Sequence, residues 1–207
     1  MRDIALETKI LKLLDLDLKN GLLKGNKIQK YLSEHLGEIT FDELKIPISI
    51  VATDINTGEK VVFREGRVLD AIRASIGIPG VFTPYKHNNR HLVDGGIIEN
   101  LPVQSLQHPH AVIAVSVLMD ARKHVKVKKS FFFPNGHILS NGYGMIRKTI
   151  NIMMAQNELG SIRSRESILV ISPERDDIDY YNFNKMNLMI DEGYRVSVVL
   201  GDFFKQN

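Results

Sequence analysis

The chain has 207 residues, no cysteine, a formal net charge of +3 and 43% hydrophobic residues. These values suit one folded domain with a sizeable core, and they exclude a disordered chain, disulfides and thiolate chemistry within these residues. The apolar runs fall far short of the ~20 residues of a membrane span and no signal peptide pattern is visible, so we expect a cytoplasmic protein, with or without peripheral membrane contact.

Hydrophobic spacing and turn residues divide the first half of the chain into helices and strands. Gly37 ends one predicted helix, Thr40 and Glu43 form a capping box, and Gly58 lies in the turn of a predicted hairpin. The predicted elements are, in order, helices over 4–18 and 26–36, a helical turn over 40–43, strands over 46–53 and 60–64, a helix over 68–75 and a strand over 91–93.

The second half of the chain continues this alternation. An uninterrupted apolar run predicts a strand over 111–117 with both faces buried, and Met and Ile side chains between 145 and 154 predict a helix that contributes to the core. A strand over 167–172 and a closing helix over 184–204 follow. Strands alternating with helices predict an α/β fold, and no linker divides the predicted single domain over 1–207.

Asp94, Gly95 and Gly96 form the motif of greatest chemical interest. A strand that ends at Asp94 would fix its carboxylate, and the two glycines would permit positive φ and leave room for another backbone or a substrate to come close. A carboxylate held in this way can take a proton from a hydroxyl nucleophile within ~3 Å. Because this tripeptide is also common in ordinary turns, its sequence context decides the interpretation.

Four segments give that context. They are, in chain order, 51–58 (VATDINTG), 71–84 (AIRASIGIPGVFTP), 92–96 (LVDGG) and 100–102 (NLP). Their sequence and order resemble the patatin-like phospholipase family, of the bacterial short-chain type. The resemblance begins near Leu11, continues through Val117, and extends more weakly to Tyr194.

The resemblance implies a layered α/β fold with flanking helices and a lipid acyl hydrolase with a Ser–Asp dyad and no catalytic histidine. Asp94 matches the proton acceptor of the family's D-G-[GA] motif. Ala74, Ser75 and Pro79 match its A-S-x-x-x-P block, which we interpret as supporting structure. Asn100 is expected either to brace the loop behind Asp94 or to act as a simple helix or turn cap.

Two further blocks of the family, a glycine-rich oxyanion loop and a G-x-S-x-G nucleophile turn, do not occur in the chain. Both would precede Met1, so we expect 1–207 to be a partial domain that lacks its N-terminal part and has little activity alone. Ser75 is a poor substitute nucleophile, because Arg73 stands where the strained turn needs its first glycine.

A non-catalytic protein that binds lipid or a protein partner is the alternative. Five Lys or Arg residues within 122–129 and the aromatic run 131–133 motivate it, since basic residues beside exposed aromatics suit a membrane surface. A solvated basic loop and buried phenylalanines explain the same residues. The sequence contains no nucleic-acid-binding motif and no aromatic residues interleaved with the basic run, so we do not expect nucleic-acid binding.

No metal site or cofactor is expected. His87, His91, His108 and His110 lack the spacing and the acidic neighbours of a metal site, and we expect them in exposed loops. The acidic segment 176–179 lacks the glycine and distal glutamate of a calcium-binding loop and is expected to be a solvated turn.

Overall fold

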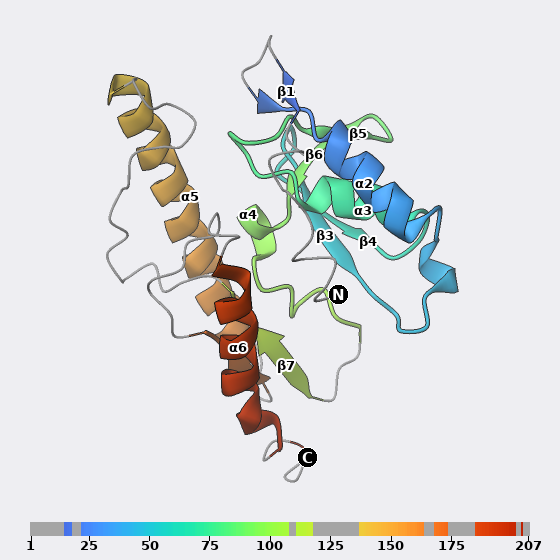
Figure 1. The fold of residues 1–207 in the computed structure, drawn as a ribbon, viewed down its shortest axis with the longest axis vertical. Helices are drawn as coiled ribbons and strands as arrows, with labels where there is room; N and C mark the ends of the chain where they lie inside the picture. Colours follow the sequence, from blue (N-terminus) through green and yellow to red (C-terminus); the bar gives the residue numbers. More distant parts are fainter. Residues whose placement is uncertain are drawn as a thin grey trace. The chain divides into compact units, whose positions relative to one another are not determined.

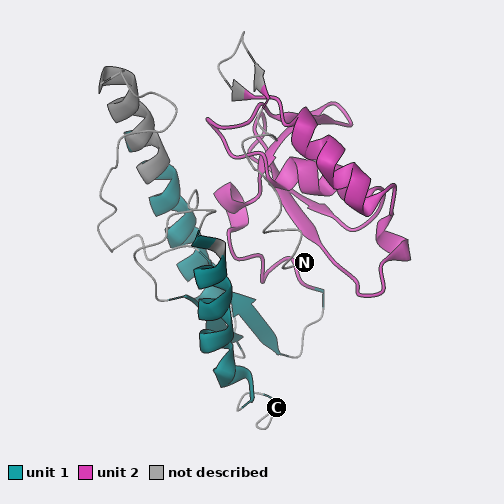
Figure 2. Ribbon diagram, in the orientation of Figure 1, with its two compact units in different colours: residues 1–7, 107–207 teal, residues 8–106 magenta. Residues whose placement is uncertain are grey.

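The computed structural model describes residues 15–17, 22–107, 111–117, 137–163, 168–173, 185–201 and 204. Within these residues the chain forms two compact units, one within 8–106 and one within 107–207 (Figures 1 and 2). Both combine helices with strands, so the predicted α/β class is confirmed. The site predicted from the sequence lies entirely in the first unit.

A four-stranded antiparallel sheet forms the centre of the first unit. Its order is β4 (Lys60–Phe63), β3 (Ile50–Asp54), β6 (Arg90–Asp94) and β5 (Tyr85–His87). The predicted hairpin is confirmed, with Ile50 opposite Phe63 and Thr53 opposite Lys60. The first strand was predicted to start at Ile46, but residues 46–49 have no ladder partner and Ile46 is 79% exposed.

Two helices cover this sheet in layers. Helix α3 (Val68–Ser75) packs on β3 and β6, and α2 (Asn26–Leu36) packs on α3 (Figure 1). Both helices have the predicted bounds, and Gly37 ends α2 with φ 63°. The predicted capping box is present on the 3-10 helix Phe41–Glu43. The core between sheet and α3 consists of Phe41, Ala52, Phe63, Val68, Ala71, Ala74 and Leu92.

The predicted helix over 4–18 is wrong at its described end. Leu16–Asp17 is strand β1, which pairs with β2 (Leu22–Leu23), whereas residues 4–14 lie outside the described residues. The cause is the neighbouring Asp15, whose carboxylate accepts hydrogen bonds from the N–H groups of Gly25, Asn26 and Lys27 at the start of α2. Periodicity does not reveal such a distant capping contact.

The second unit contains a parallel pair, β7 (Val112–Val115) and β8 (Ile168–Ile171). Its helices are α5 (His137–Arg163), α6 (Met186–Val196) and the 3-10 helix Ser197–Val199. The strand predicted over 111–117 is present but shorter, and the prediction that both its faces are buried is wrong, because Ile113 and Val115 are exposed. Met145 is 73% exposed, so the Met and Ile stripe on α5 is not uniformly core.

Candidate active site

The backbone of Asp94 is held from two directions. Asp94 ends β6 opposite Ala52 of β3, and its N–H donates to the carbonyl of Gly77, 3.0 Å away. Its carbonyl accepts a hydrogen bond from Thr53 Oγ1 at 3.1 Å, and Thr53 is itself buried. The predicted placement of this carboxylate at a strand end is therefore confirmed.

The Asp94 carboxylate is partly buried and has one close donor. The N–H of Gly96 donates to Asp94 Oδ1 at 2.7 Å. Burial raises the pKa of Asp94 and the Gly96 hydrogen bond lowers it, with burial the larger influence, so the pKa lies above its ordinary value. Oδ2 of Asp94 accepts no hydrogen bond from the part of the chain that the structure describes.

Gly95 is required by a close backbone approach. A Cβ atom at this position would lie 2.3 Å from the carbonyl oxygen of Val51 on β3. Its φ is −67°, so Gly95 does not use the positive φ that glycine permits, whereas the expected close approach of another backbone is confirmed. Gly96 then begins α4 (Gly96–Glu99), the single helical turn whose first N–H reaches back to Asp94.

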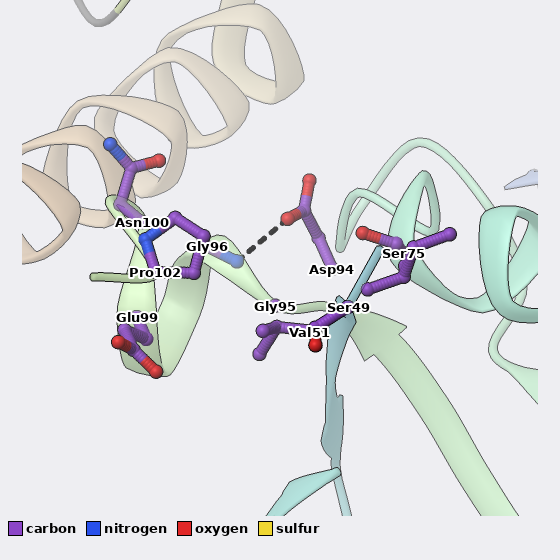
Figure 3. A pocket seen from close by; sticks show the side chains of 10 residues that line it. Ser49, Val51, Ser75, Asp94, Gly95, Gly96, Glu99, Asn100 and Pro102 are labelled. Carbon is purple, nitrogen blue, oxygen red and sulfur yellow. Dashed lines mark hydrogen bonds between the residues drawn. The ribbon is translucent and has the colours of Figure 1, made fainter. Parts of the chain in front are cut away.

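A pocket of about 270 Å³ opens beside Asp94 (Figure 3). Its lining residues are Ser49, Ile50, Val51, Ser75, Asp94, Gly95, Gly96, Glu99, Asn100 and Pro102. The structure thus brings Ser75 and Asn100 together with the D-G-G motif at this pocket, whereas their supporting roles stay predictions. Ala74 and Pro79 do not line this pocket: Ala74 is buried in the core, and Pro79 lies in the turn after α3.

Ser75 is the last residue of α3 and faces the pocket. Figure 3 shows its hydroxyl oxygen on the side directed toward Asp94. Within the described residues no hydrogen bond joins the Ser75 hydroxyl to the Asp94 carboxylate. Ser75 therefore lines the pocket wall. Its supporting role stays a prediction.

Sequence reasoning missed two residues that organise this site. Thr53 bonds the Asp94 backbone, and Glu99 accepts hydrogen bonds from Lys60, Gln104 and Ser105. The available signal for Glu99 was a charged residue directly after two apolar residues that follow the D-G-G motif. Its partners come from β4 and from the loop after α4, so the spacing of residues could not identify them.

Of the histidines and charged or aromatic runs singled out in the sequence, only His87 and His91 lie within the described residues. His87 and His91 lie on β5 and β6 rather than in loops, and His91 Nδ1 lies 3.0 Å from Asn56 Nδ2. Among the described residues, no three His, Asp or Glu side chains are grouped to hold a metal ion. His108, His110, the basic run 122–129, the aromatic run 131–133 and the acidic segment 176–179 lie outside the described residues.

No helix in the described part of the chain is long and apolar enough to cross a membrane.

Comparison with known proteins gives one family match and several relatives. A family model described as patatin-like phospholipase matches residues 3–106. An uncharacterized NTE family protein of Mycobacterium tuberculosis is 38% identical over 112 residues, which are 54% of this chain and 31% of that protein. A second such protein from this species is 34% identical over 83 residues, 40% of this chain and 14% of that protein.

The neuropathy target esterase sws of Drosophila melanogaster is 27% identical over 112 residues, 52% of this chain and 8% of that protein. The chain therefore spans about a third or less of the length of these curated relatives.

Proposed function

Because this chain belongs to the patatin-like phospholipase family, we propose that it carries the proton acceptor of a serine acyl hydrolase that cleaves lipid acyl esters. Asp94 is that acceptor. The observation that carries the proposal is the Asp94 carboxylate at the pocket, with Oδ1 held by the Gly96 N–H and Oδ2 without a donor in the described part of the chain.

The chemistry requires one oxygen to be fixed and another to be available. The Gly96 hydrogen bond orients the carboxylate, so that Oδ2 can accept the proton of a serine hydroxyl within ~3 Å. Partial burial raises the pKa of Asp94, which makes the carboxylate a stronger base than a solvated aspartate. A Ser–Asp dyad of this kind needs no histidine to activate its nucleophile.

The nucleophile of the proposed dyad lies outside these 207 residues. No G-x-S-x-G sequence occurs in them. Without a nucleophile and the donors that stabilise the developing oxyanion, a base alone gives little acceleration. We therefore expect the 207-residue chain by itself to hydrolyse acyl esters weakly or not at all.

The first test concerns the chain alone. A fluorophosphonate probe, which labels activated serines, is expected to leave the purified 207-residue chain unlabelled, and hydrolysis of a short-chain p-nitrophenyl ester is expected at background rate. Labelling that disappears in Ser75→Ala would assign the nucleophile to Ser75 and overturn the proposed dyad.

The second test supplies the nucleophile. A polypeptide that joins an in-frame G-x-S-x-G segment to these residues is expected to cleave the ester, and Asp94→Asn should lower kcat by about 10²–10⁴-fold. Asp70→Asn is the matched control, because Asp70 accepts a hydrogen bond from Tyr85 outside the pocket. Equal activity in Asp94→Asn and Asp70→Asn would remove Asp94 from the proposed mechanism.

A further inference from the structure

Helix α4 links Asp94 to a second, buried carboxylate. The helix has one turn, in which the N–H groups of Ile98 and Glu99 donate to the carbonyl of Gly95 at 3.1 and 2.9 Å. A single turn is marginal by itself, because helix nucleation fixes several residues for few hydrogen bonds. Contacts at its two ends must therefore hold it in place.

The last residue of α4 provides the stronger of these contacts. Glu99 is only 4% exposed. Its Oε1 accepts from the N–H groups of Gln104 and Ser105 at 2.8 and 3.2 Å, and its Oε2 accepts from Lys60 Nζ at 2.8 Å and Ser105 Oγ at 2.6 Å. Burial raises the pKa of Glu99, but the four hydrogen bonds that its carboxylate accepts lower it. Together the hydrogen bonds outweigh burial, so the pKa lies below its ordinary value.

These bonds tie the C-terminal end of α4 to the sheet. Lys60 begins β4, and the carbonyl of Ser105 accepts a further hydrogen bond from Arg64 Nη2 at 2.7 Å, just after β4 ends. Figure 3 shows Glu99 and Asp94 at opposite ends of the α4 turn, with their carboxylates pointing in different directions. Glu99 thus holds the turn from which the Gly96 N–H reaches Asp94.

We propose that Glu99 is a positioning residue for Asp94: by anchoring α4 to β4 and to residues 104–105, it fixes the direction of the Gly96 N–H and thereby the orientation of the Asp94 carboxylate. The catalytic meaning of this role rests on the proposed function. The geometric role itself does not, and it can be measured in the 207-residue chain without any activity.

The test uses the amide of Gly96 as a reporter. In the chain labelled with ¹⁵N-glycine, the chemical shift of the Gly96 amide changes with pH as its acceptor Asp94 ionises. The glycine signal that no longer titrates in Asp94→Asn is thereby assigned to Gly96. Glu99→Gln removes the charge that anchors α4. It is expected to raise the midpoint of the Gly96 titration by about one pH unit, because the ionised form of Asp94 loses a well-directed hydrogen bond.

Controls separate positioning from general stability. Glu43→Gln is the matched control, because Glu43 also accepts hydrogen bonds in a short helical turn but lies outside the pocket; its Gly96 midpoint should equal that of the unmodified chain. Ser105→Ala removes only one donor of Glu99 and should raise the midpoint by a smaller amount. If Glu99→Gln does not fold, the Gly96 midpoint in Ser105→Ala tests the positioning role of Glu99 instead.

An unmoved Gly96 midpoint in folded Glu99→Gln, or in Ser105→Ala if only that variant folds, overturns the proposal. In the polypeptide that contains G-x-S-x-G, Glu99→Gln should shift the acid limb of kcat/KM by the same amount as the amide titration. A polypeptide with no hydrolysis at all would count against the proposed function alone, since the amide titration still decides the positioning role.

Discussion

At the scale of single residues, the site depends on backbone fit as much as on its carboxylate. Gly95 allows β3 and the loop after β6 to approach so closely that no side chain can be accommodated at this position. The next residue, Gly96, begins α4, and its N–H donates to the Asp94 carboxylate. The second residue of the D-G-G motif is therefore a packing requirement, and the third supplies a donor.

Replacing Gly95 with alanine is expected to destabilise the first unit by roughly 1–3 kcal/mol, the usual cost of overpacking, because its Cβ would meet the Val51 carbonyl at 2.3 Å. Urea unfolding measures this difference. Gly160→Ala is the control: a Cβ there meets nothing within 4 Å in helix α5, and alanine is the better helix former. Equal stability of the two variants would contradict the proposed clash.

The raised pKa of Asp94 predicts a pH-dependent effect of Asp94→Asn. Because burial raises the pKa in the folded state, folded protein retains this proton at pH values where the unfolded chain has lost it. Stability then falls as pH rises from the unfolded value of 3.8 through the folded pKa. Asp94→Asn avoids this loss, so it should be more stable than the unmodified chain at pH 7.

The stability difference between Asp94→Asn and the unmodified chain should shrink toward zero below pH 3.8, where both states carry the proton. Thermal unfolding at a series of pH values measures it. A variant that is less stable than the unmodified chain at neutral pH would show that the ionised carboxylate contributes favourably to the fold.

At the scale of elements, Arg73 joins α3 to the segments on either side of it. Its side chain is 3% exposed, and Nη2 donates to the carbonyls of Lys24 and Thr83 at 2.6 and 3.2 Å. The guanidinium also lies 5.7 Å from the ring centre of Phe82 and 5.4 Å from that of Tyr85. It therefore holds the start of α2 and the strand β5 against the helix that ends at Ser75.

Arg73→Lys is expected to destabilise the chain by about 2 kcal/mol, because an ammonium group cannot reproduce the contacts with two rings together with hydrogen bonds to two separate carbonyls. Chemical denaturation checks the value. Arg67→Lys is the matched control, since Arg67 forms an exposed pair with Glu38 and such pairs contribute little. A similar loss in both variants would mean that the geometry of the Arg73 guanidinium is not what matters.

At the scale of the whole molecule, every residue that lines the pocket comes from the unit within 8–106. This unit also has its own core between the sheet and α3. The family match over 3–106 covers the same part of the chain. The local geometry of Asp94 is therefore expected to be a property of this unit alone.

A shortened chain of residues 1–106 should keep that geometry. Labelled with ¹⁵N-glycine, it is expected to show the Gly96 amide at the shift seen in the full chain, with the same titration midpoint. The reason is that Asp94, Gly96, Glu99 and their described partners all lie before residue 107. Loss of the Gly96 signal from its folded position would show that residues 107–207 are needed to form the pocket.

The sequence predicted the elements whose causes are local. Gly37 ends α2, Thr40 and Glu43 cap the helical turn, and the Asn56–Gly58 turn joins β3 to β4. The order of motifs in 51–102 predicted the family and the placement of Asp94 at a strand end. These features follow from backbone propensity and from residue types at fixed spacing, and both can be read directly from the sequence.

The tertiary structure alone decided what depends on contacts between distant residues. The bond from Lys60 to Glu99, the burial of Arg73 and the contact of Gly95 with Val51 join segments that are far apart in the chain. The exposure of Met145 on α5 was likewise hidden, because helical spacing shows which residues share a face but not whether anything covers it. Residue type thus located the proposed base, and packing determined how its carboxylate is held.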